Sequence, residues 1–195
     1  MDEPRNGQRW VVSMRAWQEA LASRASAAEA ALRYAVEMRD DSCRLVGRPP
    51  WHPVTMGEML EAAIAVTGAT MGNIQLFDPT TNALTIVAER GFRPRFLDFF
   101  ACVHDGEAAC GASLTSRRRV VVDDVTDSPI FFGSAALEVM LDAGARAVQS
   151  TPFFDNAGQI LGVVSTHYRA PRRLNVTEHC RLDMLAFQVA RVVAP

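Results

Sequence analysis

Cys110 is the residue of this sequence with the clearest potential for covalent chemistry. It is one of four cysteines, and it lies where a short helix is predicted to begin. Exposed backbone amides and the helix dipole at such a position lower the pKa of a thiol and make it more nucleophilic. The alternative is a small apolar side chain buried at a tight turn. We favour that alternative, because free cysteines are among the most buried residues.

Polar side chains form a second candidate site, in a predicted hairpin between residues 146 and 168. Residues 155–159 supply the turn, because Asp and Asn side chains bond nearby backbone and Gly158 adopts positive φ readily. Amides, hydroxyls and an imidazole interrupt the β-branched and aromatic residues of both flanking strands: Gln149, Ser150, Thr151, Ser165, Thr166 and His167. This pattern predicts one wall of a binding pocket, with a solvent-facing surface as a nearly equal alternative.

Residues that alternate along a strand share one of its faces, and this selects the lining candidates. Asn73 and Gln75 share a face of one predicted strand, and Gln149 and Thr151 share a face of another. A register error of one residue would exchange the faces. His167 could bond a ligand or report pH, and a hydrogen-bonded structural histidine is the alternative. Because a site needs a few convergent polar groups, the predicted ligand-binding residues are Asn73, Gln75, Cys110, Gln149, Thr151, Ser165 and His167.

The sequence offers no other complete set of catalytic or metal-binding groups. All 20 cationic residues are Arg, so no lysine can form a Schiff base or serve a phosphate-binding loop. The cysteines form no Cys-x-x-Cys pair and have no zinc-ligand spacing to a histidine. Asp123 and Asp124 precede a turn and are predicted to cap backbone rather than hold a metal. We therefore predict no catalytic residue and no metal site, and the sequence does not specify a cofactor.

Charge and hydropathy predict which classes of partner the protein lacks and in which compartment it resides. The 195-residue chain has a net charge of −2, which predicts no general affinity for nucleic acids or anionic membranes. No apolar run approaches the roughly 20 residues that a bilayer requires, and the first residues lack a signal-peptide core. Four scattered thiols are typical of a reducing compartment. We therefore expect a cytoplasmic protein, and the use of Arg with abundant Ala suggests a GC-rich bacterial genome.

A long helix is predicted between residues 9 and 38, where apolar residues recur at spacings of three and four without Pro or Gly. Its narrow apolar stripe, which includes Trp10 and Trp17, fits a seam between two helices better than a broad core face. We interpret it as a dimerising or signal-transmitting helix, and packing along its own domain is the alternative. A Pro- and Gly-containing linker follows. The predicted division is therefore 1–53, N-terminal helix and linker, and 54–195, a globular domain.

The globular domain is predicted to be α+β. Strands that follow one another through tight turns pair antiparallel, and the intervening helices must cover the sheet. Capping-box spacing marks the start of the first and last helices of the domain. The predicted elements are a helix from 55 to 67, strands at 71–78 and 84–89, a short helix from 94, a helix ending near 117, a strand at 120–122, a helix at 134–143, the hairpin, and a helix from 176.

This order and spacing resemble the GAF family of sensory domains, over roughly residues 54–193. The resemblance rests on five segments together: 71–78, Cys110-Gly111 at the start of a helix, 119–125, 147–152 and 162–167. It is greatest to the GAF modules that accompany bacterial sensor kinases. The resemblance implies a roughly six-stranded antiparallel sheet, helices behind it, a ligand pocket on the other face, and dimerisation through the terminal helices.

Departures from the family's known motifs limit what can be carried over. The Asn-Lys-x-n-Phe-x-x-x-Asp-Glu signature of cyclic-nucleotide-binding members cannot be complete without a lysine. The Cys-His pair of many bilin-binding members is absent, since Gly111 follows Cys110. Cys102 and Cys110 lie in the region where free methionine sulfoxide reductases of this family carry cysteines, but their spacing does not match convincingly.

Three functions follow as hypotheses. The leading one is a non-enzymatic sensory or regulatory domain that binds a small molecule or a partner and signals as a homodimer through its terminal helices. Its output would pass to another protein, such as a histidine kinase. The second is a thiol-dependent reductase of the free methionine sulfoxide reductase type that uses Cys110 with Cys102. The third is a structural dimerisation module whose pocket is filled by side chains.

Overall fold

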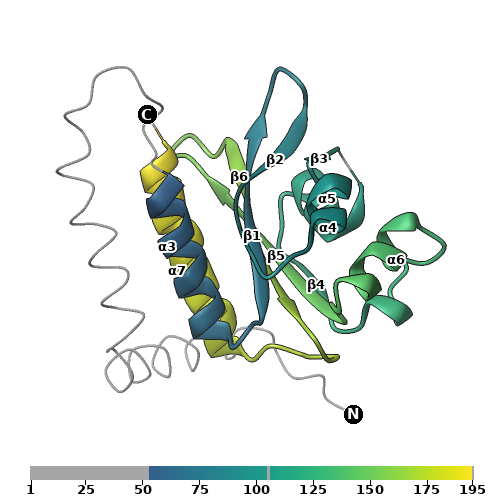
Figure 1. Ribbon diagram of the computed structural model, residues 1–195. Coiled ribbons are helices and arrows are strands. Elements are labelled where there is room, and N and C mark those ends of the chain that lie inside the picture. The colour runs from purple at the N-terminus through teal and green to yellow at the C-terminus, as the bar shows by residue number, and fades with distance from the viewer. Residues whose placement is uncertain (1–52, 105, 195) are drawn as a thin grey trace, which may run out of the picture.

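The computed structural model describes residues 53–104 and 106–194, which form one antiparallel sheet with helices on both faces (Figure 1). The predicted helix at 9–38 and most of the linker lie outside the described residues, and the division of the chain near residue 53 stays a prediction. The elements are α3 (Pro53–Thr67), β1 (Met71–Asp78), β2 (Ala83–Arg90), α4 (Pro94–Phe99), β3 (Cys102–Val103), α5 (Ala108–Ser116), β4 (Val120–Val122), the 3-10 helix η1 (Val125–Asp127), α6 (Ala135–Asp142), β5 (Ala147–Phe154), β6 (Ile160–Tyr168) and α7 (Val176–Val193).

The six strands lie in the order β3-β2-β1-β6-β5-β4, and each pairs antiparallel with its neighbours. The predicted fold class, α+β with a roughly six-stranded antiparallel sheet and flanking helices, is confirmed. The sequence did not predict β3, which has two residues and is too short to show a period. Strand β4 pairs only with residues 148–150 of β5. Pro152 of β5 lies beyond this paired segment, so the N–H that proline lacks removes no hydrogen bond between β5 and β4.

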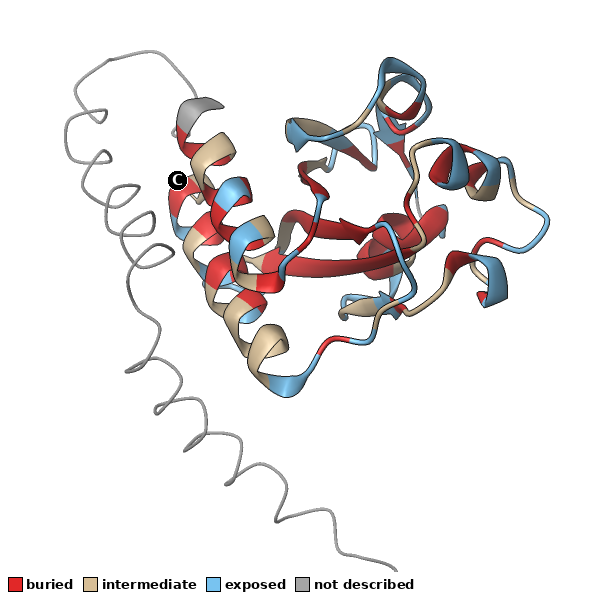
Figure 2. Ribbon diagram, turned by 60° about the horizontal axis from the view of Figure 1, so that its bottom comes forward, coloured by how far each residue is buried: buried red, intermediate tan, exposed pale blue. Residues whose placement is uncertain are grey.

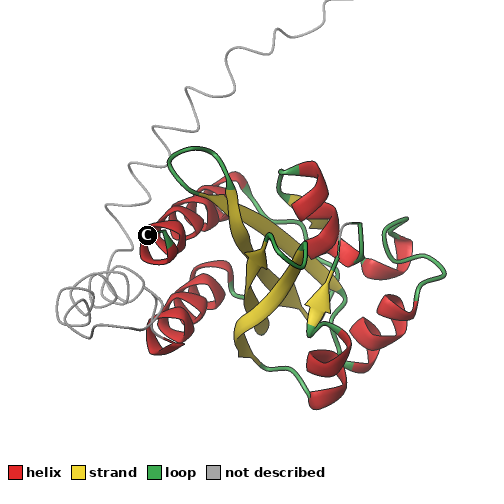
Figure 3. Ribbon diagram, turned by 90° about the horizontal axis from the view of Figure 1, so that it is seen from above, coloured by secondary structure: helices red, strands yellow, loops and turns green. Residues whose placement is uncertain are grey.

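Helices α3 and α7 lie side by side on one face of the sheet (Figures 1 and 3). Leu60 of α3 and Leu185 of α7 are buried in one cluster with Ile74 and Val164 of the central strands. The predicted capping box of α7 is present. The Glu178 N–H donates to Asn175 Oδ1 at 3.0 Å, and the Asn175 N–H donates to Glu178 Oε2 at 2.8 Å. This layer is the side of the molecule away from the candidate site.

The opposite face is covered by α4, α5 and α6 and by the turns between them (Figure 3). A second buried cluster lies here, in which Phe96, Phe131 and Met140 pack toward the strands. With helices on both sides, β5 and β6 are buried along nearly their whole length (Figure 2). The polar residues of the hairpin therefore do not form a solvent-facing strand surface, which removes one of the two interpretations of this hairpin.

Candidate functional site

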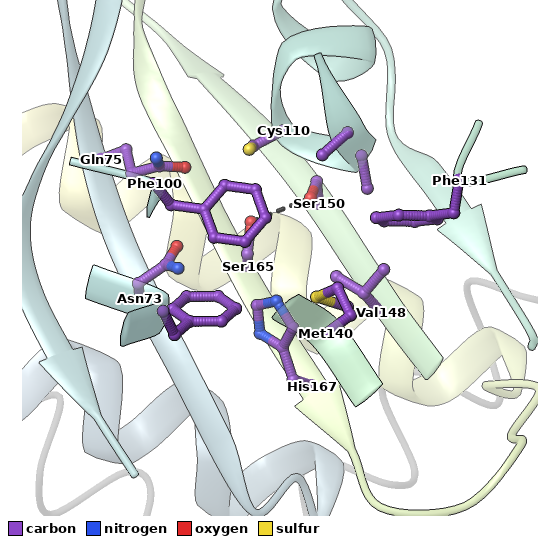
Figure 4. Close-up of a pocket in the computed structure, with 13 residues that line it drawn as sticks. Asn73, Gln75, Phe100, Cys110, Phe131, Met140, Val148, Ser150, Ser165 and His167 are labelled. Atoms are coloured by element: carbon purple, nitrogen blue, oxygen red, sulfur yellow. Dashed lines mark hydrogen bonds between the residues drawn. The ribbon is translucent and has the colours of Figure 1, made fainter. Parts of the chain in front are cut away.

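A small cavity lies between the sheet and the α4–α5–α6 layer (Figure 4). Strands β1, β5 and β6 form its floor, and residues of all three helices form its roof. The lining residues are Asn73, Gln75, Phe96, Phe100, Ala108, Ala109, Cys110, Phe131, Met140, Val148, Ser150, Ser165 and His167. The floor brings together residues almost a hundred positions apart in the sequence.

Cross-strand register builds the polar floor. Asn73 of β1 pairs with Ser165 of β6, and Ser165 pairs in turn with Ser150 of β5. Residues paired in this way point to the same face, so an amide and two hydroxyls form a row across three strands. The hydroxyls of Ser150 and Ser165 hydrogen-bond to each other at 2.8 Å. His167 and Gln75 lie on either side of this row, two residues along their strands.

Four polar atoms of this floor are buried without a hydrogen-bond partner in the structure, apart from an interaction of the Gln75 amide with the Cys110 thiol. They are Asn73 Oδ1, both amide atoms of Gln75, and Nδ1 of His167. The three residues are 3%, 0% and 4% exposed. Buried polar groups are normally paired, and each exception requires an explanation. Four of the eight such atoms among the described residues belong to this one cavity, and the other four are dispersed over Glu58, Asp123, Gln149 and His179. Four unpartnered atoms around one cavity is the arrangement expected where a bound molecule completes the hydrogen bonds.

His167 is held as a neutral imidazole. Burial lowers its pKa to about 3. Its ring meets the faces of Phe92 and Phe96 edge-on, with centroids 5.0 and 5.7 Å away. The two phenyl rings stack on each other with centroids 3.7 Å apart. The histidine is therefore fixed by aromatic contacts and offers Nδ1 for hydrogen bonding rather than a positive charge.

Aromatic and apolar side chains fill most of the space above this floor. Phe100, which directly follows α4, approaches from one side, and Phe131 and Met140 approach from the other (Figure 4). Phe96 of α4 also lines the cavity. The remaining cavity is about 20 Å³, which is room for one or two waters. A larger occupant therefore requires side chains of the roof to move.

Cys110 lies in the first turn of α5 and faces the cavity near Gln75 (Figure 4). Backbone N–H groups at the helix start lower the pKa of its thiol, as predicted, but burial raises it more, so that the pKa is about 11. The negative charge of Glu107 adds to this rise. The thiol is therefore protonated at neutral pH, and the favoured alternative, a buried small side chain, agrees with its environment. Cys102 is exposed on β3, and neither thiol is in a disulfide.

The close approach of α5 to the preceding loop requires a glycine at position 111. A Cβ atom there would lie 2.4 Å from the carbonyl oxygen of His104, well inside normal contact. Gly111 therefore lets the first turn of α5 rest against this loop and sets the depth of the neighbouring Cys110 in the roof.

Gln149 and Thr151 do not line the cavity, and this corrects their predicted placement. Ser150 lies between them and faces the cavity, so both neighbours point to the α3–α7 layer. There Arg119 donates from Nε to Thr151 Oγ1 at 3.3 Å and from a terminal nitrogen to the carbonyl of His179 on α7 at 3.1 Å. The other predicted residues line the cavity, and their role in ligand binding stays a prediction: Asn73, Gln75, Cys110, Ser165 and His167.

Sequence reasoning missed Ser150 and the roof residues. The position of Ser150 opposite Ser165 in the hairpin was the available signal, since both hydroxyls fall on one face in this register. No comparable signal marked Phe100, Phe131 or Met140, because they reach the cavity from helices and a turn that the sequence pattern does not orient.

A family model described as the GAF domain matches residues 53–194. The chain belongs to the GAF domain family. This match confirms the resemblance to the GAF family, which was predicted from the sequence over roughly residues 54–193. Among curated proteins, none matches the sequence significantly.

Solved structures with the same fold come from proteins with different names. One is a domain of a protein assigned as a two-component sensor histidine kinase from Sinorhizobium meliloti, with 20% identity, a TM-score of 0.60, and coverage of 72% of this chain and 88% of that one. Another is the free methionine-R-sulfoxide reductase of Neisseria meningitidis in complex with its substrate, with 16% identity, a TM-score of 0.61, and coverage of 88% and 92%. These likenesses establish the fold.

A third structure is the phycoerythrobilin-bound GAF domain of a cyanobacterial phytochrome, with 18% identity, a TM-score of 0.62, and coverage of 87% and 95%. A sensor kinase domain, a reductase and a phytochrome domain thus share this fold. Within the described part of this GAF domain, no group of three or more His, Cys, Asp or Glu side chains is placed to hold a metal. No helix among the described residues is long and apolar enough to cross a membrane.

Proposed function

We propose that this GAF domain is a non-enzymatic sensory module that binds a small molecule in the cavity beside β1, β5 and β6. The observation that carries the proposal is the convergence of unpartnered polar atoms from Asn73, Gln75 and His167 on one cavity. Leaving a buried polar group unpaired costs about 1–3 kcal/mol, so a molecule that pairs several of these atoms gains affinity from each.

The unpartnered atoms also weigh against a structural module with a collapsed pocket. A core that serves packing alone would be as stable or more stable with apolar residues in place of Asn73 and Gln75. Waters can satisfy part of the floor, and the cavity of about 20 Å³ has room for one or two. Water held in this way marks a polar site that a ligand can enter by displacing it.

The reductase alternative has less support from the site. A thiol reductase needs a thiolate nucleophile, whereas burial raises the pKa of Cys110 to about 11. Cys102, its predicted partner, is exposed on β3, and Cys102, Cys110 and Cys180 are all free thiols. The likeness to methionine sulfoxide reductases extends to the fold, and the thiol chemistry does not follow from it.

Signal transmission in this proposal runs through the sheet to the helices on its other face. β1, β5 and β6 contribute side chains both to the cavity and to the cluster beneath α3 and α7. A ligand that favours one arrangement of these helices in a homodimer would shift the population of that arrangement. The output would reach another cytoplasmic signalling protein, such as a histidine kinase.

The test uses protein that has been unfolded, dialysed free of small molecules and refolded. A filtrate of small metabolites from a bacterial host should raise its melting temperature, because a ligand bound only to the folded state stabilises it. A matched filtrate from which the protein has already extracted its ligand serves as the control. If the refolded protein regains no stability with any filtrate while its fold is intact, the ligand-binding proposal is wrong.

A further inference from the structure

The cavity provides no charge. None of its 13 lining residues has a charged side chain, and the ion pairs between described residues all lie outside it. The charge that acts on the lining residue Cys110 is that of Glu107, which is exposed at the N-cap of α5. His167 is neutral at physiological pH. A charged group entering this site would lose its hydration without gaining a counter-ion.

The unpartnered atoms present both kinds of hydrogen-bonding group. The amide of Gln75 has two donors and an acceptor. Apart from an interaction with the Cys110 thiol, which lowers the pKa of that thiol, neither its Nε2 nor its Oε1 has a partner. Asn73 Oδ1 and His167 Nδ1 add two more free positions on the same floor. Exchanging the nitrogen and oxygen of either amide leaves this mixture of donors and acceptors unchanged. A carboxylate only accepts and an ammonium only donates, so neither can complete the set.

We propose that the occupant is an uncharged molecule with a planar amide-type group, such as an amide, a urea or a lactam ring, that both donates to and accepts from Gln75. This inference rests on the proposed function and specifies its ligand class. The stacked rings of Phe92 and Phe96, with Phe100 beside them, offer apolar surface to the rest of a flat ligand. Because the free space is about 20 Å³, side chains of the roof must move when such a ligand enters.

Three matched probes test this with the full chain. Benzamide, benzoate and benzylammonium share one ring and differ in charge and hydrogen-bonding capacity. Their affinities are measured by NMR titration at equal ionic strength and pH 7. Benzamide should bind at least tenfold more tightly than either charged probe, and its binding should perturb the side-chain amide signal of Gln75.

Two glutamine variants locate the binding. Gln75 and Gln149 are both buried strand glutamines with an unpartnered acceptor, 0% and 1% exposed, but they point to opposite faces of the sheet. Gln75→Leu should weaken benzamide binding at least tenfold, whereas Gln149→Leu should change it less than twofold. The melting temperature of Gln75→Leu should not fall below that of the wild type, because the substitution removes unpaired polar atoms at similar volume. A merely structural Gln75 would instead lower the melting temperature.

Equal or tighter binding of benzoate or benzylammonium would overturn the inference, as would unchanged benzamide binding in Gln75→Leu. If no probe binds, the molecule recovered from the stabilising host filtrate decides: an uncharged amide-type ligand supports the inference and a charged one overturns it. If the recovered ligand is charged, the inference about its class fails but the proposed ligand-binding function stands. If no filtrate stabilises the protein either, the proposed function fails together with the inference.

Discussion

Cys110 shows how burial overrides a favourable position in a helix. The first turn of α5 supplies amides that lower the pKa of the thiol, yet desolvation raises it to about 11. At pH 7 roughly one molecule in ten thousand would then carry the thiolate. We predict that iodoacetamide modifies exposed Cys102 at least about a hundredfold faster than Cys110 in the native protein, as measured by peptide mapping.

A urea-unfolded sample, in which these cysteines react at similar rates, is the control for the alkylation. Modification of Cys110 in the native protein as fast as that of Cys102 would contradict the account, and it would revive the reductase hypothesis.

His167 should make stability depend on pH. Its folded-state pKa of about 3 lies below the ordinary value of 6.5, so the unfolded chain binds the extra proton between these values. Its contribution to stability is therefore complete above pH 6.5 and is lost as the pH falls toward 3. Urea unfolding between pH 6.5 and 4.5 should show a steeper loss of stability for the wild type than for His167→Gln, by up to about 1.4 kcal/mol per pH unit. Parallel pH profiles would show that the imidazole titrates normally.

Most of the polar floor was predictable from the sequence, and the reason why Ser150 was missed while Gln149 and Thr151 were chosen is specific. The period of two identifies which residues share a face, and this placed Asn73 with Gln75 and Ser165 with His167. It does not identify which face meets the cavity. Because β5 is buried on both faces, the polarity of Gln149 and Thr151 gave no warning that Ser150 was the lining residue.

At the scale of elements, most local signals were reliable. The exception is the capping box predicted at Thr55, because α3 already begins at Pro53. β1 has the predicted bounds, the capping box of α7 is formed, and the helix from Pro94 is present as α4. These features depend on neighbouring residues, so the sequence contains them directly. The roof over the cavity depends on how α4, α5 and α6 pack across the sheet, and no local pattern encodes that packing.

The packing of α5 can be tested at Gly111. Because an added Cβ would lie 2.4 Å from a backbone oxygen, Gly111→Ala should cost about 1–3 kcal/mol of stability and lower the melting temperature by roughly 3–10 °C. The matched control is Gly57→Ala in α3, where an added Cβ meets nothing within 4 Å. That substitution should stabilise the helix by about 0.5–1 kcal/mol, as measured by thermal unfolding. A Gly111→Ala protein as stable as the wild type would contradict the close contact.

At the scale of the whole molecule, the proposed homodimer places α7 at the interface. Val176 and Phe187 are 61% and 58% exposed, and eleven residues of helix place them on one side of α7. We predict that the wild type sediments as a dimer and that Phe187→Asp shifts it toward monomer. Phe132→Asp, on a phenylalanine that is 83% exposed on the other side of the sheet, should leave the dimer intact. A monomeric wild type, or a dimer insensitive to Phe187→Asp, would contradict this arrangement.

The central claim is that the cavity beside Gln75 holds a small molecule, and native mass spectrometry tests it most directly. The wild type and Gln75→Leu would be purified from the same bacterial host and sprayed under gentle and denaturing conditions. The account predicts an excess mass on the gently sprayed wild type that disappears on denaturation and is reduced or absent in Gln75→Leu. A wild type of bare polypeptide mass, or an excess mass that Gln75→Leu retains in full, would contradict it.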